Sequence, residues 1–355
     1  MVTLRYNIQM IMIFLKTSIR HILTFLVFMC AALCSIARDS VSSYIPHVHG
    51  VVRGRWELDT EDGYSRFQVR NARVQVLGNV GPVFSYYINT DFCDRGKVEV
   101  KDAYIGAQAL PWLSFRLGQF RQPFGMDSFR GPASQIFANR SFIGRYMANT
   151  RSVGVRAAFD VPTLPLVIEA GVFSPYSITE QKKWTRHYDY AARAIWKIAS
   201  GPKIIGGFQS IIPDSIRINL WNIGASYSIR SLTFEAEYLY KHYTCGSHKA
   251  AHGYLVTADY SLPLKKSRTF NAISFQGRFE GMTRHSSGVR NANRLLADDN
   301  PARRRLTLGT TLTGDYGNKV FAALRLNYEK NFYDDGYKPS VDNSDRIVAE
   351  LVVSF

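Results

Sequence analysis

Several features that would define other protein classes are missing from this sequence. After its first forty residues it has no apolar run near the ~18 residues of a membrane helix. Four cysteines in 355 residues are too few for a disulfide scaffold, and no Cys/His spacing resembles a zinc site. No Gly-x-Ser-x-Gly elbow of a serine hydrolase occurs. We therefore expect no cofactor, no metal and no catalytic residue.

The N-terminus has the features of an export signal. A region rich in Lys and Arg, without acids, leads into the apolar run "HILTFLVFMCAALCSIA", which ends on a small-x-small triplet. The run is shorter than the ~20 residues that span a bilayer, which favours cleavage over a membrane anchor. We expect residues 1–37 to be a cleaved signal peptide and residues 38–355 to form one domain.

Positive charge is in excess, with 44 Lys and Arg against 28 Asp and Glu and a net charge of +16. Such a surplus suits nucleic acid, an acidic surface or an anionic solute. Export argues against nucleic acid, and no basic cluster with interleaved aromatics marks a nucleic-acid module. Small anionic solutes and acidic lipopolysaccharide are the expected partners.

Past the leader, short alternating apolar and polar runs are separated by Gly, Pro, Asn, Asp and Ser, which is the pattern of strands and turns. The pattern predicts sixteen strands, at 47–59, 66–80, 83–92, 97–109, 113–121, 152–160, 166–174, 188–198, 203–212, 217–229, 232–243, 252–262, 270–283, 303–315, 320–333 and 346–355.

The two faces of these strands differ sharply. In "LTFEAEYLYK" and "FAALRLNYEK" one face is wholly apolar and the other carries charge. A soluble sandwich would pack the apolar faces inward, whereas a transmembrane barrel turns them toward lipid and keeps a wet interior. Export, the even strand number, and the 20 Tyr and 22 Phe available for interfacial girdles favour the barrel. The fold class predicted is all-β, a transmembrane antiparallel β-barrel of about sixteen strands.

The connections and the last strand add two expectations. The longest connection, around 122–151, is expected to fold into the barrel and narrow it. The strand at 346–355 is expected to close the barrel against 47–59 and to place Phe355 at the membrane boundary.

The stretch "FRLGQFRQPFG", residues 115–125, resembles the signature of the phosphate-selective porin family (outer-membrane porin O/P type) of Gram-negative bacteria. Segments within 66–92, 100–108 and 150–160 fit the same family in order. The resemblance implies a sixteen-stranded porin in the bacterial outer membrane, usually a homotrimer. It also implies passage of small anions through a constriction lined by Arg and Lys. The terminal Phe355 resembles the assembly signal that the barrel assembly machinery recognises.

The chain departs from the family in lacking a pronounced N-terminal coiled-coil extension, and its external loops are short. A general anion preference is therefore the safer expectation, with phosphate as one candidate.

Strand parity places many cations on the inward face, where rings of Arg or Lys concentrate anions and repel cations. Arg73 fits this face only if a bulge near Asn71 shifts the parity. Each arginine could instead brace the wall by pairing with Glu or Asp, and parity does not separate the two roles. The predicted pore-lining and anion-binding residues are Arg53, Arg55, Arg70, Arg73, Lys101, Arg116, Arg121, Arg156 and Arg193, with Arg130, Arg140 and Arg145 as further cations of the long loop.

The predicted function is an outer-membrane porin for passive diffusion of small solutes, with anion preference. The alternatives are a non-conducting structural or adhesive barrel and, further off, an outer-membrane hydrolase. The segment "KHYTCGSHKAAH" collects His and Cys and could bind a metal, but a solvated loop is the favoured interpretation.

Overall fold

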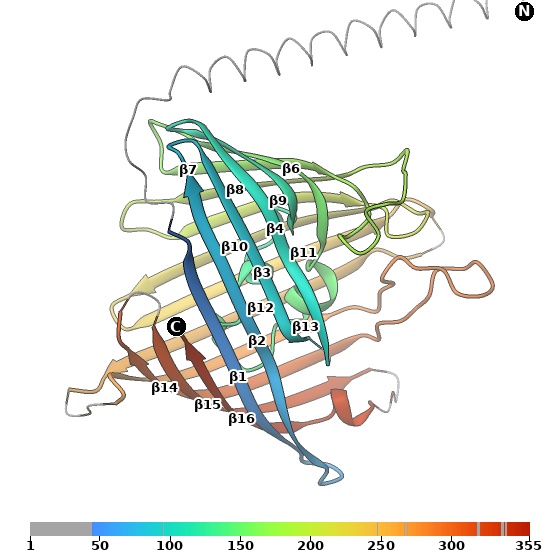
Figure 1. Cartoon of the computed structure of the whole chain (residues 1–355). Coiled ribbons are helices and arrows are strands. Elements are labelled where there is room, and N and C mark those ends of the chain that lie inside the picture. The colour runs from blue at the N-terminus through green and yellow to red at the C-terminus, as the bar shows by residue number, and fades with distance from the viewer. Residues whose placement is uncertain are drawn as a thin grey trace, which may run out of the picture.

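The computed structural model describes residues 45–355 except 95, 247, 266, 268, 318, 319, 335, 336 and 338. The expected signal peptide, residues 1–37, lies outside the described residues. Sixteen strands form one closed antiparallel barrel in which each strand pairs with its neighbours in sequence and β1 pairs with β16 (Figure 1). The predicted fold class is confirmed.

The strands are β1 (His47–Asp59), β2 (Ser65–Val80), β3 (Phe84–Asp94), β4 (Lys97–Leu110), β5 (Leu113–Arg121), β6 (Arg151–Asp160), β7 (Leu166–Phe173), β8 (Asp189–Lys197), β9 (Lys203–Ile211), β10 (Ile218–Ile229), β11 (Leu232–Tyr243), β12 (Ala251–Pro263), β13 (Ala272–Met282), β14 (Arg303–Asp315), β15 (Phe321–Tyr333) and β16 (Arg346–Ser354). Their bounds lie close to the predicted ones, because alternation stops where Gly, Pro and Asn-rich turns begin.

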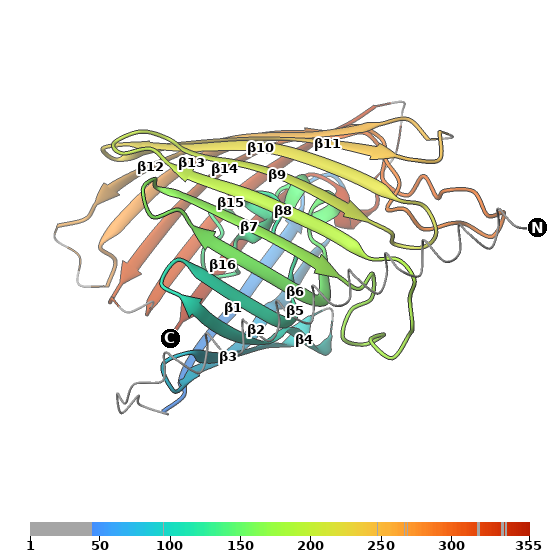
Figure 2. The ribbon, with the colours of Figure 1, turned by 90° about the horizontal axis from the view of Figure 1, so that it is seen from above.

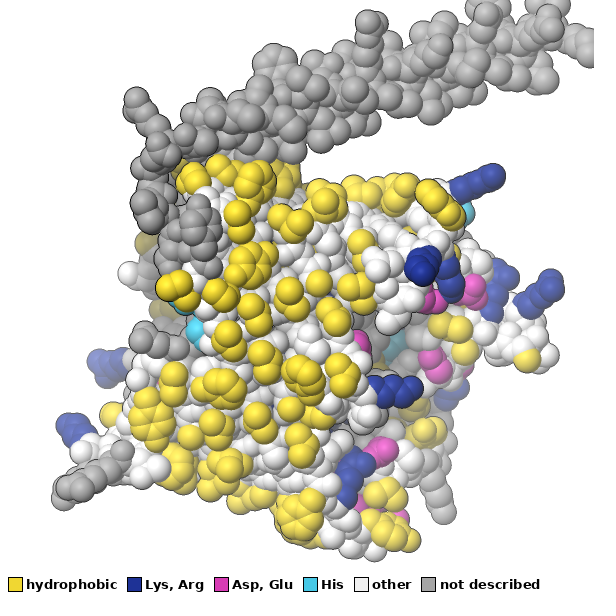
Figure 3. All heavy atoms as spheres, viewed as in Figure 1, with side chains coloured by type: hydrophobic (Ala, Val, Ile, Leu, Met, Phe, Trp, Pro, Cys, Tyr) yellow, Lys and Arg dark blue, Asp and Glu magenta, His cyan; other side chains and the backbone are white. Residues whose placement is uncertain are grey.

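The outer and inner faces follow the alternation. On β14, Leu306 and Leu308 are exposed on the outside, whereas Arg305 and Thr307 are buried on the inside. Apolar side chains cover the visible outer wall, and charged side chains gather at one rim (Figure 3). Apolar side chains outside and charged side chains inside are the reverse of the arrangement in a soluble protein. A lipid environment requires this arrangement.

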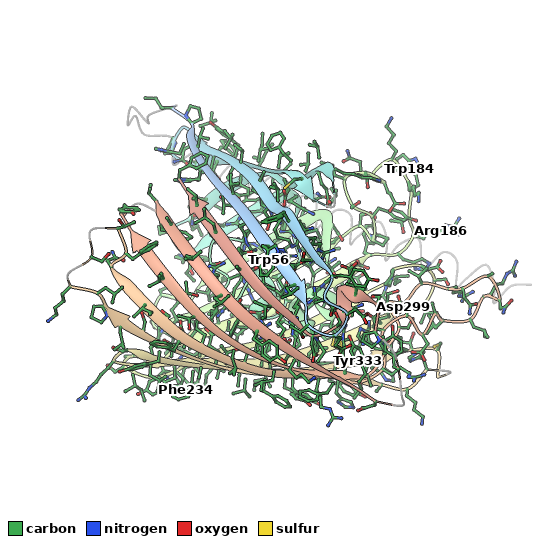
Figure 4. The ribbon with its side chains drawn as sticks, turned by 90° about the horizontal axis from the view of Figure 1, so that it is seen from below. Trp56, Trp184, Arg186, Phe234, Asp299 and Tyr333 are labelled. Atoms are coloured by element: carbon green, nitrogen blue, oxygen red, sulfur yellow. The ribbon has the colours of Figure 1, made fainter. Side chains whose placement is uncertain are left out.

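The two ends of the barrel differ. The turns at 81–83, 111–112 and 230–231 are short and lie at the end where β1 begins and β16 ends. The other end carries the long connections at 122–150, 174–188, 283–302 and 334–345. Figure 4 shows Trp184, Arg186 and Asp299 together at this loop end, while Phe234 projects outward from the wall.

A bulge sets the inward face of β2. Arg53 pairs with Asn71 and Gly54 pairs with Val69, so Arg70 is the extra residue of β2. The shift puts both Asn71 and Arg73 on the inner face, where they are buried. The bulge predicted near Asn71 is confirmed.

The chain terminus completes the closure. The backbone of Phe355 exchanges two hydrogen bonds with Gly50, from Gly50 N to Phe355 O at 2.7 Å and from Phe355 N to Gly50 O at 3.0 Å. The Phe355 ring covers Gly50, where a Cβ would lie 2.2 Å from the ring. Glycine at this position therefore makes room for the terminal aromatic ring.

Among the described residues, three short helices interrupt the loops: η1 (Asp127–Phe129), η2 (Ile143–Met147) and η3 (Val341–Asn343). In the part of the chain that the structure describes, no helix is both long and apolar enough to cross a membrane.

Candidate functional site: the barrel lumen and its internal loop

The connection between β5 and β6, residues 122–150, lies inside the barrel, where η1 and η2 are visible between the walls (Figure 2). Its apolar residues pack on inward-facing apolar residues of the wall, and this cluster includes Phe124, Ile143 and Met147 from the loop with Leu239 and Leu255 from β11 and β12. Such packing gives the loop a small hydrophobic core of its own.

Buried carboxylates of the wall hold backbone amides of the loop. Glu237 of β11 accepts hydrogen bonds from Met126 N at 2.7 Å and from Asp127 N at 2.9 Å. Glu280 of β13 accepts one from Phe142 N. Charge-assisted bonds to backbone amides are among the stronger hydrogen bonds in proteins, and these two acids are therefore occupied by the loop.

Aromatic rings of the loop stack on wall guanidinium groups. Arg193 lies 3.6 Å from the centre of the Phe129 ring, and Arg278 lies 4.6 Å from that of Phe137. Desolvated cation–π contacts of this kind add to the anchoring of the loop. These arginines are covered by the loop and not by solvent.

Both backbone polar groups of Ala138, in the internal loop, form hydrogen bonds with the barrel wall. Its carbonyl accepts from Arg53 Nη2 at 2.6 Å. Its amide donates to Asn327 Oδ1 at 2.7 Å. A loop backbone whose donors and acceptors are both satisfied by the barrel wall has little freedom to move.

The next two carbonyls are held in the same way. Asn139 O accepts from Arg278 Nη1 at 3.2 Å, and Arg140 O accepts from Arg305 Nη2 at 2.7 Å. We call the four wall residues that bind the backbone of residues 138–140 the loop clamp. The loop clamp consists of Arg53, Arg278, Arg305 and Asn327.

A cavity of about 560 Å³ lies between this loop and the wall formed by β1, β2 and β4. Ten of its lining residues are cationic and two are acidic. The cationic residues are Arg53, Arg55, Arg66, Arg70, Arg73, Lys101, Arg140, Arg145, Arg151 and Arg346, and the acidic ones are Glu99 and Asp342.

Five of the predicted pore-lining residues line this cavity, namely Arg53, Arg55, Arg70, Arg73 and Lys101. The structure brings them together because β1, β2 and β4 are near neighbours in the barrel and the Arg70 bulge keeps Arg73 on the inner face.

The other four predicted residues lie elsewhere. Arg156 and Arg193 share the carboxylate of Glu169 as a buried ion-paired group. Arg121 is buried, donates to the carbonyl of Ser128, and lies near the Phe129 ring.

Arg116 lies 4.7 Å from the centre of the Tyr104 ring. None of these four is among the residues that line the cavity.

Within the cavity most cations already have a carboxylate partner. Arg73 pairs with Asp91 at 2.8 Å, and Lys101 pairs with Glu99 at 2.8 Å. Such pairs brace the wall and reduce the positive field that a passing solute meets.

Arg140 and Arg145 differ from these paired cations. Among the described residues neither has a carboxylate within ion-pair distance. Arg140 Nη2 donates to Arg130 O at 2.9 Å, while Arg140 Nη1 is buried and has no hydrogen-bond partner. Burial and the neighbouring cations, first Arg73 and then Arg151, lower the pKa of Arg140 to about 9. Because Arg140 has a buried donor without a hydrogen bond and no carboxylate within ion-pair distance among the described residues, an anion beside it would be stabilised.

Sequence reasoning missed several lining residues. The pattern predicts that the loop extends to residue 151, whereas Arg151 begins β6 and pairs with Asp102 at 3.0 Å. Arg346, on the inward face of β16, lines the cavity as well. The alternation along the last strand, which puts Arg346 on the inward face, was a signal that could have identified it. Gln135 and Asn139 enter through the path of the loop, which no local pattern in the sequence reveals.

The histidine-rich segment gives no metal site. Among the described residues, no three His, Cys, Asp or Glu side chains gather in a group that could hold a metal ion. Cys93 and Cys245 are not joined by a disulfide.

One family model matches the N-terminal half of the barrel. The family model described as phosphate-selective porin O and P matches residues 55–201. The resemblance to the phosphate-selective porin family is confirmed. The matched segment includes β2 to β8, the internal loop and every predicted pore-lining cation except Arg53. A search of curated proteins finds no match.

Solved structures share the fold of this porin-like barrel. The anion-selective porin from Comamonas acidovorans matches with a TM-score of 0.57 at 11% identity, covering 88% of this chain and 99% of that chain. OmpF of Salmonella typhi, in complex with daunomycin, matches with 0.61 at 13% identity, covering 87% and 97%. The outer-membrane channel DcaP of Acinetobacter baumannii matches with 0.60 at 12% identity, covering 90% and 99%.

Proposed function

We propose that this protein is an outer-membrane porin that lets small solutes diffuse passively and prefers anions. The observation that carries the proposal is the internal cavity of about 560 Å³ with ten cationic and two acidic lining residues. A lumen of one charge sign raises the local concentration of counter-ions and repels ions of the same sign. The family match and the fold favour a channel over an enzyme.

The position of the loop strengthens the expected preference. Three acids of the opposite wall, Glu237, Glu280 and Glu329, are buried and bonded to the loop or to Arg305. The cationic wall of β1, β2 and β4 faces the cavity instead. A solute would therefore pass along a surface on which the lining cations outnumber the lining acids by ten to two.

The size of the cavity suits more than one class of anion. Its lining offers guanidinium forks that match the oxygens of phosphate and carboxylate equally well. The relative that is described as anion-selective supports a general anion preference, and phosphate is one candidate solute.

Planar bilayer recording of the refolded protein tests the proposal. Discrete conductance steps, with a reversal potential toward the chloride value under a potassium chloride gradient, are the expected result. A folded barrel without conductance would contradict the porin function and favour a structural or adhesive barrel. Conductance with cation preference would contradict the assignment of the cavity as the selectivity site.

The assembly and location belong to the same proposal. We infer a homotrimer in the bacterial outer membrane, in contact with lipopolysaccharide, inserted by the barrel assembly machinery through the strand that ends at Phe355. A shallow apolar hollow on the outer wall at Gly54, bordered by Trp56, Phe67 and Leu324, is a candidate subunit contact. Mass measurement of the detergent-solubilised protein by light scattering distinguishes trimer from monomer.

A further inference from the structure

We propose that Arg53 and Glu350 are positioning residues for anion selectivity, which act by holding the internal loop so that Arg140 faces the cavity. This inference rests on the proposed porin function and assigns a different role to Arg53 from that of a direct anion contact. It also assigns a favourable role to a negative charge inside an anion-selective lumen.

The donors of Arg53 leave nothing for a solute. Its Nε and Nη2 donate to Glu350 at 3.1 and 2.7 Å, and Nη2 also donates to Ala138 O at 2.6 Å. Its Nη1 donates to Gln135 Oε1 at 2.7 Å and to Asn71 Oδ1 at 3.4 Å. A guanidinium has five N–H groups, and all five are engaged. Arg53 is also only 2% exposed.

Two of these bonds reach the loop. Gln135 and Ala138 both belong to the segment that precedes Arg140. The bond to Ala138 O makes Arg53 a member of the loop clamp, which holds residues 138–140. Arg53 thus connects β1 to the loop segment that carries the unpaired cation.

Glu350 sets the orientation of Arg53. Its carboxylate is 1% exposed and receives the forked donors of Arg53 on one side and Arg325 Nη1, at 3.1 Å, on the other. A bidentate pair fixes the plane of a guanidinium, and therefore the direction of its remaining donors toward the loop. Without the carboxylate, Arg53 would keep its charge and lose that direction.

The substitution Glu350→Gln distinguishes a positioning role from a purely electrostatic one, because the two roles predict opposite changes in anion preference. Simple electrostatics predicts that removing a negative charge from the lumen raises anion preference. Positioning predicts the reverse, because the loop and Arg140 lose their fixed place. The expected result is a smaller reversal-potential shift toward chloride than in the unmodified protein, with noisier open-channel current. A larger shift would overturn the proposal.

Glu99→Gln is the control, since Glu99 lines the cavity and pairs with Lys101 of its own strand instead of with a loop-clamp residue. It removes the same charge, and here the chloride shift should increase. If both variants increase the shift, Glu350 acts only through its charge.

Arg53→Lys tests the same idea without any change of charge. Lysine cannot form the fork to Glu350 while also reaching Ala138 O. The expected result is a reduced anion preference. Arg325→Lys is its control, because Arg325 shares Glu350 and is not part of the loop clamp. An unchanged reversal potential in Arg53→Lys, with folding intact, would overturn the proposal.

A double mutant shows whether the effect passes through Arg140. If Arg53 acts by placing Arg140, then Arg53→Lys should add no further loss of selectivity in an Arg140→Gln background. Additive losses would mean that Arg53 acts on the solute by itself.

Folding of each variant is verified by the mobility shift of the unheated barrel on a denaturing gel. If Glu350→Gln fails to fold, the charge-preserving Arg53→Lys still decides the question. Absence of conductance in the unmodified protein would refute the porin function itself, whereas normal conductance with unaltered selectivity in these variants would refute only the positioning role.

Discussion

At the scale of single residues, the environment of each arginine decides whether it braces the wall or faces the solute. Arg156 and Arg193 are buried against Glu169 and hold two strands to a shared carboxylate. Arg140 has no carboxylate partner among the described residues and has a buried donor without a hydrogen bond, at the edge of the cavity. Arginines that count equally toward the net charge of the sequence therefore have unequal effects on a passing ion.

Arg140→Gln should lower the anion-to-cation permeability ratio. A unit charge at ~5 Å in water attracts an anion by about 0.8 kcal/mol and repels a cation by as much, so a decrease of about fifteen-fold in the ratio is expected. Reversal potentials in bilayers measure it. Arg156→Gln removes an equal charge outside the cavity and should change selectivity far less. An equal effect of both substitutions would show that the ratio depends on total charge alone.

At the scale of elements, close backbone contacts fix how strands and loops fit together. Gly118 of β5 has φ +138°, and a Cβ there would lie 2.3 Å from Ala103 O and 2.7 Å from Tyr104 Cα of β4. Glycine is required both by the backbone conformation and by the space.

Gly118→Ala should destabilise the β4–β5 pairing by about 2 kcal/mol or more, because strain and steric overlap combine. Urea unfolding in detergent, followed by tryptophan fluorescence, measures the loss. Gly206→Ala in β9 is the control, since its Cβ would meet nothing within 4 Å. Equal stability of the two variants would contradict the requirement for glycine at 118.

The loop at 283–302 carries a titratable group that is kept neutral. His285 is fully buried, and burial together with Lys241 lowers its pKa to about 4. Because the folded pKa lies below the ordinary value of ~6.5, the folded loop loses stability as pH falls from about 6.5 toward 4.

Proteolysis of residues 283–302 should therefore accelerate as the pH is lowered through this window. Limited digestion with an acid-tolerant protease at stepped pH, followed by mass spectrometry, measures it. His285→Gln removes the titrating group and should flatten the pH dependence of cleavage. A protection that does not vary with pH in the unmodified protein would contradict the assignment.

At the scale of the whole molecule, the barrel exposes its apolar residues and encloses its charges. Leu308 lies in the middle of β14 and is 52% exposed on the outer face. A lipid environment accounts for that exposure, whereas water would not.

Leu308→Lys should destabilise the protein in lipid vesicles by about 2–4 kcal/mol, the cost of a charge near the bilayer midplane. Reversible urea unfolding from vesicles measures it. Leu164→Lys, at an equally exposed position in the turn 161–165 at the barrel end, should cost little. Similar small costs at both positions would argue against residence of β14 in the membrane.

The sequence alone determined the strands, their two faces, the closure of the last strand on the first and the bulge that turns Arg73 inward. Those features follow from side-chain period and turn residues, which are local. Only the tertiary structure decided which arginines line the cavity. Arg53 meets Glu350 from the other end of the chain, and Arg53 also binds the internal loop that the loop clamp holds. Such pairings depend on the register of the strands and on the path of the loop, and alternation along one strand carries no information about either.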